Sequence, residues 1–344
     1  MMWVAWRQHR AALMTFAVII VAAAAYLAYL GVRMHASIGD LGLDACAAPA
    51  ARTCPGAAAV FRDSYSGIPV QLQALALIPP LLAMLVGAPL VAQELERGTQ
   101  RLAWMQSVSR RRWLLVKVSL VMAFVGVGLL VVGMLVQWCC GPLVSAGMAS
   151  RLEPLIFTTA GIVPAAYGAL ALSIGVASGA LLGRLLPAMV VALVVFLFVL
   201  VAAMFLRPHY APSTTLTQPA TSLDLVMAAA PIQQGMLISS EFVTANGVSL
   251  GRGASNTNMP ALRKACADVG KPFDQSENIT PDPSLTAITF PSDDCARLIG
   301  LTRVTQYQPE DMFWRFQLTE FVLLAVASVL FLAAALRRVT RLDT

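Results

Sequence analysis

The sequence predicts an all-α integral membrane protein with six transmembrane helices and a large external segment between the fifth and sixth helices. Hydrophobic residues make up 58% of the 344 residues and charged residues only 12%, whereas an ordinary soluble domain has about 25% charged residues. The apolar residues also gather in runs of about 20, the length that a helix needs to cross the hydrocarbon layer. A soluble core would instead show periodic alternation of apolar and polar residues.

Six apolar runs are long enough to span a bilayer, and only helices satisfy the backbone within runs of this length. The predicted spans are Ala11–Leu30, Val70–Ala92, Leu114–Val136, Leu155–Leu182, Leu186–Leu206 and Leu318–Leu336. Proline removes a helix hydrogen bond, so we expect kinks at Pro79, Pro80, Pro89 and Pro164. The first run has some features of a signal peptide, but its apolar part is longer than the usual ~7–15 residues. We interpret it as an uncleaved span, with a signal peptide as the alternative.

The charges predict the orientation of these spans. The two termini and the segments after the second and fourth spans contain twelve basic and only three acidic residues, and the opposite side contains twelve basic and fifteen acidic residues. The positive-inside rule therefore predicts a multi-pass protein of the cell membrane with both termini in the cytoplasm. The net charge of +6 is then a signal of topology, and we expect no nucleic acid partner.

The external segment after the fifth span differs from the rest of the chain. It is rich in Pro, Ser, Thr, Asn and Asp and has no apolar run long enough to span. Its length of about a hundred residues indicates a small folded lobe rather than a simple loop. We therefore expect spans one to five in residues 1–206, an extracellular lobe in 207–317, and the sixth span with a cytoplasmic tail in 318–344.

Four cysteines lie in segments predicted to be external. Cys46 and Cys54 lie between the first two spans, and Cys266 and Cys295 lie in the lobe. Disulfides persist in oxidising compartments. Pairing within each segment is the simplest connectivity, although four cysteines allow three. We predict the disulfides Cys46–Cys54 and Cys266–Cys295.

The cytoplasmic segment between the second and third spans is the most informative part of the sequence. Gly98 can end the helix that precedes it, and Thr99 can cap a new short helix that ends near Ser107. Ser109 is a second possible cap, at the start of the third span. A short helix between two spans lies across the membrane surface, where it presents apolar and basic side chains. From these residues alone it either docks a cytosolic partner or only holds lipid headgroups.

Two short runs in this segment carry a resemblance to a known family. They are Glu94–Thr99 (ELERGT) and Gln106–Arg110 (QSVSR), the latter followed by Trp113. They are similar to the loop after the second span in permease subunits of ATP-binding-cassette (ABC) exporters, in the actinobacterial branch of the six-span type-2 superfamily. The opening residues Trp3–Arg10 resemble the interfacial helix of that branch, and Tyr307–Gln317 resembles its entry into the last span.

The resemblance implies a coupling helix that docks into a separate ABC ATPase subunit, and a second permease copy as a further partner. The residues that it assigns to ATPase coupling are Glu94, Glu96, Gly98, Thr99, Arg101, Trp104, Met105, Gln106, Ser107 and Arg110. The external lobe matches no pattern of the family.

Other classes of function find little support in the sequence. No G-x-x-x-x-G-K-[ST] motif occurs, so we do not expect the chain to be an enzyme that hydrolyses ATP itself. His9, His35 and His209 are far apart, and we expect no metal site and no cofactor. Glu320 lies near the outer end of the last span, where we expect it to cap the helix start or to pair with Arg315, with contact to a substrate as the alternative.

We therefore interpret the chain as the permease subunit of an ATP-driven exporter that works as a pair of permeases and moves an amphipathic or apolar compound. The alternative is a membrane sensor whose external lobe binds a ligand and whose basic cytoplasmic loop docks a signalling partner.

Overall fold

The computed structural model describes residues 2–46, 53–98, 109–220, 235–247, 249, 251, 259–270, 273–274, 290–291 and 293–341. The chain divides into two compact units. The first unit is Met1–Tyr210 together with Glu310–Thr344, and the second is Ala211–Pro309. The second unit lies within the segment 207–317 that the sequence singles out as a lobe.

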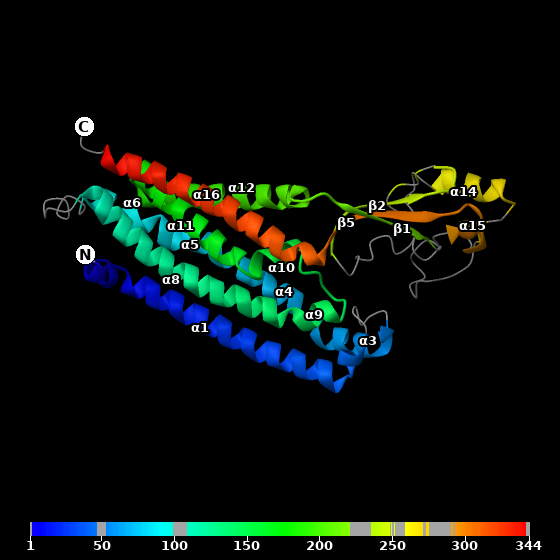
Figure 1. The fold of residues 1–344 in the computed structure, drawn as a ribbon. Coiled ribbons are helices and arrows are strands. Elements are labelled where there is room, and N and C mark those ends of the chain that lie inside the picture. The colour runs from blue at the N-terminus through cyan, green and yellow to red at the C-terminus, as the bar shows by residue number, and fades with distance from the viewer. Residues whose placement is uncertain are drawn as a thin grey trace, which may run out of the picture. The chain divides into compact units, whose positions relative to one another are not determined.

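Five helices of the first unit are long and apolar enough to cross a membrane. They are α1 (Met2–Asp40), α8 (Arg110–Cys139), α11 (Val163–Leu182), α12 (Leu185–Leu206) and α16 (Phe313–Thr340). Each contains or closely matches one of the predicted runs, and α1 continues without a break from the N-terminal segment into the first span. The N- and C-termini lie at the same end of this unit (Figure 1).

The second predicted span, Val70–Ala92, is not one continuous α-helix, which corrects the expectation of a simple kinked helix. The chain passes through α4 (Ile68–Gln73), the 3-10 segment η2 (Ala74–Leu77), α5 (Ile78–Leu82), the π-helical segment η3 (Ala83–Gly87) and α6 (Pro89–Arg97). Pro79, Pro80 and Pro89 lack the N–H group that continues an α-helix. The winding changes to 3-10 before Pro79 and to π between Pro80 and Pro89, and such local changes commonly accompany prolines within a helix.

The fourth predicted span, Leu155–Leu182, is also interrupted. The short helix α10 (Pro154–Thr159) ends before a bend at Gly161, and α11 begins at Val163. Gly161 has φ of +71°, a backbone conformation that residues with a Cβ rarely adopt. Its N–H donates to the carbonyl of Gly133 in α8 at 2.8 Å, so the bend is fixed to a neighbouring helix.

Helix α11 is the centre of the first unit. Sixteen of its 20 residues are buried, and it packs against α16, α8, α12 and α6. Small residues make this possible, because a Cβ on Gly87 would lie 3.1 Å from the Cα of Gly175, and one on Gly179 would lie 2.7 Å from the carbonyl oxygen of Ala88. Close backbone approach through small residues is the usual basis of helix packing in membranes.

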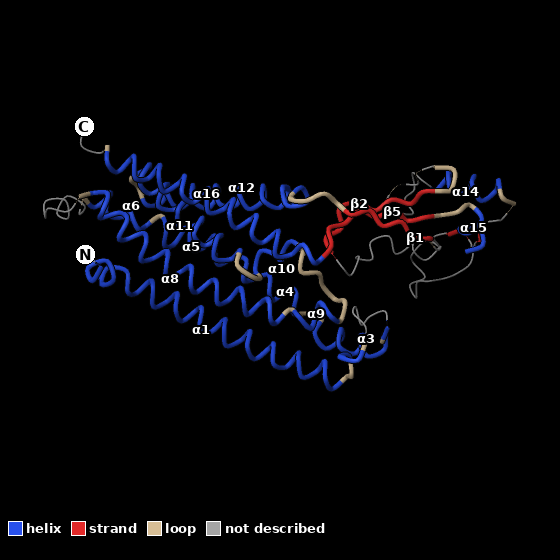
Figure 2. Tube along the Cα trace, in the orientation of Figure 1, coloured by secondary structure: helices blue, strands red, loops and turns tan. Residues whose placement is uncertain are grey.

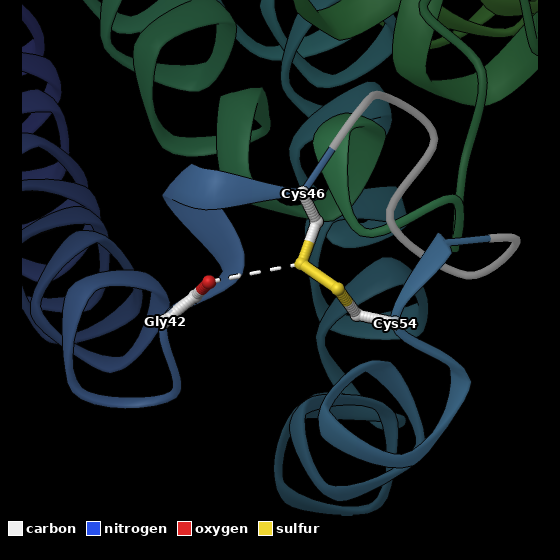
Figure 3. The surroundings of a disulfide bond; sticks show 3 residues. All are labelled: Gly42, Cys46 and Cys54. Atoms are coloured by element: carbon white, nitrogen blue, oxygen red, sulfur yellow. Dashed lines mark hydrogen bonds between the residues drawn. A yellow bond between two sulfur atoms is a disulfide. The ribbon is translucent and has the colours of Figure 1, made fainter.

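The segment between α1 and α4 forms the 3-10 turn η1 (Leu43–Ala45) and the helix α3 (Pro55–Tyr65). The predicted disulfide Cys46–Cys54 joins these elements. Figure 3 shows that the Cys46 sulfur also lies near the Gly42 carbonyl oxygen, at 3.7 Å. The remaining short elements of this unit are α9 (Gly141–Ser145), η4 (Arg207–His209) and η5 (Glu310–Met312).

The second unit adds strands to a protein that is otherwise mostly helical, as Figure 2 shows. Its three-stranded antiparallel sheet has the order β1-β5-β2, from β1 (Thr214–Pro219), β2 (Gly235–Val243) and β5 (Thr302–Pro309). The other elements are α14 (Met259–Asp268), α15 (Asp293–Leu298) and the two-residue strands β3 (Phe273–Asp274) and β4 (Phe290–Pro291). The predicted disulfide Cys266–Cys295 joins α14 to α15, and its buried sulfurs belong to a small core with Phe242, Leu262 and Leu301.

Removing the Cys266–Cys295 disulfide should loosen the second unit. It closes a sequence separation of 29 residues, and loss of such a link typically lowers stability by roughly 2–4 kcal/mol. We expect a Cys266→Ser/Cys295→Ser variant to be cut faster by protease within residues 211–309 than the wild type. A Cys46→Ser/Cys54→Ser variant is the matched control and should leave that cleavage unchanged. Peptide mapping without reductant that finds these four cysteines as free thiols would contradict both pairings.

Candidate functional site

The first candidate region lies where α6 ends. Gly98 has φ of +70° and terminates α6, as its conformational freedom predicts. The side chain of Ser109 accepts a hydrogen bond from the N–H of Arg112 and caps α8, also as predicted. Of the residues assigned to coupling, those from 99 to 107 lie outside the described residues.

Glu94 connects the end of α6 to α8. Its carboxylate forms an ion pair with the ammonium group of Lys117, which is buried and also lies 4.9 Å from the ring centroid of Trp113. An ammonium group in an apolar environment needs such a partner. The pair fixes the last turns of α6 against the first turns of α8.

Glu96 connects the same end of α6 to α12. Its Oε2 accepts a hydrogen bond from the N–H of Leu185 at 2.9 Å, and Leu185 is the first residue of α12. A carboxylate there satisfies one of the unpaired N–H groups of the helix start and interacts favourably with the helix dipole. The two acidic residues of the ELERGT run therefore fix one helix end to two different spans.

A second polar cluster lies where α12, α16 and α11 approach each other. Arg207 donates from Nε to Glu320 Oε2 and from Nη2 to Glu320 Oε1, both at 2.9 Å. Tyr167 donates its hydroxyl to Glu320 Oε1 at 2.6 Å, and the Arg207 guanidinium lies 4.2 Å from the ring centroid of Phe157. Arg207 and Glu320 are 1% and 0% exposed. We call Arg207, Glu320, Tyr167 and Gln317 the polar cluster.

Gln317 fills the interruption between α10 and α11. Its Nε2 donates to the carbonyls of Phe157 and Ala160, both at 3.1 Å, and its Oε1 accepts from the N–H groups of Ile162 and Val163, both at 3.0 Å. One amide thus satisfies two carbonyls and two N–H groups that the interruption leaves without helical partners. A Cβ on Gly161 would lie 2.7 Å from the Gln317 Oε1, so glycine is needed there for space as well as for its φ angle.

An apolar cavity of about 60 Å³ lies beside the polar cluster. Tyr167 and Pro164 of α11 form one part of its wall, Leu75 and Pro79 of the interrupted second stretch form another, and Phe196 of α12 also lines it. The cavity therefore lies between the interrupted stretch from α4 to α6 and the interrupted stretch from α10 to α11. Among the residues that the structure describes, no group of three His, Cys, Asp or Glu residues could hold a metal ion.

Comparison with known proteins decides the family of this chain. The family model described as "ABC-2 membrane transporter related" matches residues 17–207, which is more than half of the sequence. The chain belongs to this family. The match spans α1 to α12 and so includes Glu94, Lys117 and Glu96. No curated protein and no solved structure matches the chain.

Membership in the ABC-2-related family supports a multi-pass membrane protein of the permease class, a transport component whose partners are an ATPase subunit and the lipid bilayer. The match ends at Arg207, before the second unit begins. That unit is therefore not accounted for by the family model.

Sequence reasoning about this ABC-2-related chain missed most of the polar cluster. We expected Glu320 to cap a helix start or to pair with Arg315, but its partners are Arg207 and Tyr167. The available signal was a carboxylate within the last apolar run, which requires a buried partner. Arg207 directly follows the fifth apolar run, at its predicted outer end. Gln317 gave no signal, because its partners are backbone groups.

Removing one charge of the Arg207–Glu320 pair should strongly destabilise the first unit. Glu320→Met leaves the Arg207 guanidinium buried without its carboxylate, which costs roughly 3–5 kcal/mol, and Arg207→Met should cost about as much. The double variant removes both charges and should be more stable than either single variant. Thermal unfolding in detergent measures these differences. Arg315→Gln is the control and should unfold like the wild type; an effect of Arg315→Gln as large as that of Arg207→Met would contradict the assigned pairing.

Proposed function

We propose that this chain is the permease subunit of an ATP-driven exporter, that it pairs with a second copy, and that each copy docks one separate ABC ATPase. The match of residues 17–207 to the ABC-2-related family is the observation that carries the proposal. The sequence contains no phosphate-binding G-x-x-x-x-G-K-[ST] motif, so ATP hydrolysis belongs to the partner.

The contacts of Glu94 and Glu96 support a mechanical role for the segment that follows them. We propose that the residues after Gly98 form a coupling helix and that α6 connects this helix to the spans. Because Glu94 holds α8 through Lys117 and Glu96 holds the start of α12, a displacement of the coupling helix would reach two spans at once. Trp104 and Met105 are the proposed anchors in the ATPase, with Arg101 and Arg110 pairing with acidic groups at its rim.

The proposed topology follows from the number of apolar helices and from the distribution of basic residues. We propose six crossings, in which the interrupted stretch from α4 to α6 serves as the second. The termini and the coupling helix lie in the cytoplasm by the positive-inside rule, and the second unit lies outside.

The described spans carry few polar groups apart from the polar cluster, which favours an amphipathic or apolar compound as the cargo.

Reporter fusions test this topology. Fusions at Ser107 and Thr344 should read as cytoplasmic, because they lie on the side with excess Arg and Lys. Fusions at Gly56 and Gly270 should read as external. A cytoplasmic reading at Gly270 would overturn the six-crossing arrangement.

Charged substitutions at the anchors test the coupling helix. An interface depends on a few bulky buried residues, so a Trp104→Glu/Met105→Glu variant should insert normally but lose most of its co-purification with the partner ATPase. Any ATPase that remains bound should show no transport-dependent hydrolysis.

The matched control places two glutamates on exposed apolar residues of the second unit, Val269→Glu/Leu298→Glu. This control should retain the ATPase. If the Trp104→Glu/Met105→Glu variant also retains the ATPase and still transports, the segment only lies on the membrane surface and the coupling assignment is wrong.

A further inference from the structure

The cavity beside the polar cluster lies where the two interrupted stretches of the first unit meet. Ala76 and Pro79 line it where the 3-10 segment η2 gives way to α5, and Thr159 lines it at the last residue of α10. Irregular backbone at membrane depth is tolerated where it is buried in protein or lines a cavity. In transporters, interrupted helices that meet near the middle of the membrane commonly form the binding site.

The position of the cavity along α12 is that of such a site. Phe196 is the eleventh residue after Leu185, the first residue of α12, so it lies about 16 Å along the helix at about 1.5 Å per residue. Half of the hydrocarbon layer is about 15 Å thick, which places Phe196 near its middle. Leu200 and Met204 also line the cavity, and they lie one and two turns further along α12. The cavity therefore extends from the middle of the span toward η4.

The walls of the cavity differ in exposure. The lining residues from α8, α10 and α11 are buried, and so is Phe196 of α12. The lining residues that are only partly buried come from two elements, the stretch from α4 to α6 and α12, and are Leu75, Ala76, Ile78, Leu200 and Met204. The open side of the cavity therefore lies between α12 and the stretch from α4 to α6.

The lining suits a small hydrocarbon group. Apart from Thr158, Thr159 and Tyr167, every lining residue is apolar. The Tyr167 hydroxyl donates to Glu320, and the Thr159 hydroxyl donates to the carbonyl of Ile156 at 3.1 Å. Atoms that line a void lose dispersion contacts, which an apolar ligand restores. An apolar cavity of roughly 150 Å³ holds benzene, so one of about 60 Å³ has room for a smaller group, such as the end of an alkyl chain.

We propose that this cavity binds the apolar end of the exported compound, which enters from the membrane between α12 and the stretch from α4 to α6. The inference rests on the proposed transport function and adds to it the place where the cargo binds and the chemistry of the group that binds. A linear alkyl end fits the cavity, whereas a charged group or a large ring system does not. The polar part of an amphipathic cargo stays outside the open side.

The connection to α6 favours the cargo over an ordinary phospholipid chain as the occupant. The stretch that contributes Leu75, Ala76 and Ile78 to the cavity continues through η3 into α6. The end of α6 is held to α8 by Glu94 and to α12 by Glu96. A displacement of α6 by the proposed ATPase would therefore reach the cavity along one continuous stretch of chain.

Photolabelling of the full-length protein in liposomes tests the site. The probe is a fatty alcohol with a diazirine on its terminal carbon, and mass spectrometry of the digested protein locates the label. Residues 75–79 and 196–204 should carry most of it. Ala76→Phe fills the cavity and should reduce this labelling roughly tenfold, the preference that corresponds to filling a void of this volume. Ala74→Phe, at an exposed position of the same segment η2, is the matched control and should keep it.

A second probe distinguishes the cargo from bulk lipid. It is a phosphatidylcholine with the diazirine on the terminal carbon of one acyl chain, and it should label the same residues much less than the alcohol does. Equal labelling by the two probes would overturn the proposal, because the cavity would then hold lipid chains in general. Thermal unfolding in detergent checks that Ala76→Phe folds. Should it not, Leu200→Ala replaces it. This change widens the cavity and should increase labelling by an alcohol with a branched end, and unchanged labelling would contradict the site.

ATP hydrolysis separates this inference from the proposed function. The fatty alcohol without a diazirine should stimulate hydrolysis by the ATPase that co-purifies with the wild type. Ala76→Phe should still co-purify with the ATPase but lose this stimulation, and Ala74→Phe should keep it. Absence of an ATPase from the wild-type preparation would contradict the proposed function, and the cargo with it. If the ATPase is present and Ala76→Phe is stimulated like the wild type, the cavity inference alone is wrong.

Discussion

The hydrogen bonds of Gln317 are the interaction on which the arrangement of the helices depends. An interrupted helix leaves N–H and C=O groups without partners, and in an apolar environment each such group costs several kcal/mol. The Gln317 amide supplies two donors and two acceptor sites to the interruption between α10 and α11. This allows α11 to start inside the helical unit, where it serves as the central helix against which α16, α8 and α12 pack. Gly161 is the local requirement, because only glycine fits both its φ angle and the space beside Gln317.

Polar contacts then fix both ends of the unit, and small residues fix its middle. At the basic end, Glu94 and Glu96 connect α6 to α8 and α12. At the other end, Glu320 connects α16 to α11 and to the end of α12. Between these ends, the interrupted second stretch approaches α11 through glycines. A buried ion pair contributes little net stability compared with apolar packing. We infer that its effect here is to specify which helices are neighbours, because hydrogen bonds are directional and contacts between apolar side chains are not.

The sequence predicted those features that depend on local chemistry. Runs of apolar residues predicted the spans, and Gly98 and Ser109 predicted a helix end and a helix start. The presence of two cysteines in each external segment predicted the two disulfides that the structure contains. It did not predict features that depend on contacts between distant segments. The partner of Glu320 comes from 113 residues earlier. The winding of the stretch from α4 to α6 was not predicted either, because prolines predict an interruption but not whether 3-10 or π turns occur beside it. The strands β1, β2 and β5 were missed because the lobe was characterised only by composition.

The polar cluster also bears on the source of energy for transport. A carboxylate inside a membrane protein often marks a proton or ion pathway, and Glu320 is such a group. However, its two oxygens already accept hydrogen bonds from Arg207 and Tyr167, and both Glu320 and Arg207 are buried. A carboxylate that relays protons must exchange its partners with water, and breaking this pair would leave a buried guanidinium uncompensated. The geometry therefore favours a fixed structural pair over a relay. A fixed pair is compatible with the proposed separate ATPase, which would act through α6, the element that Glu94 and Glu96 connect to α8 and α12.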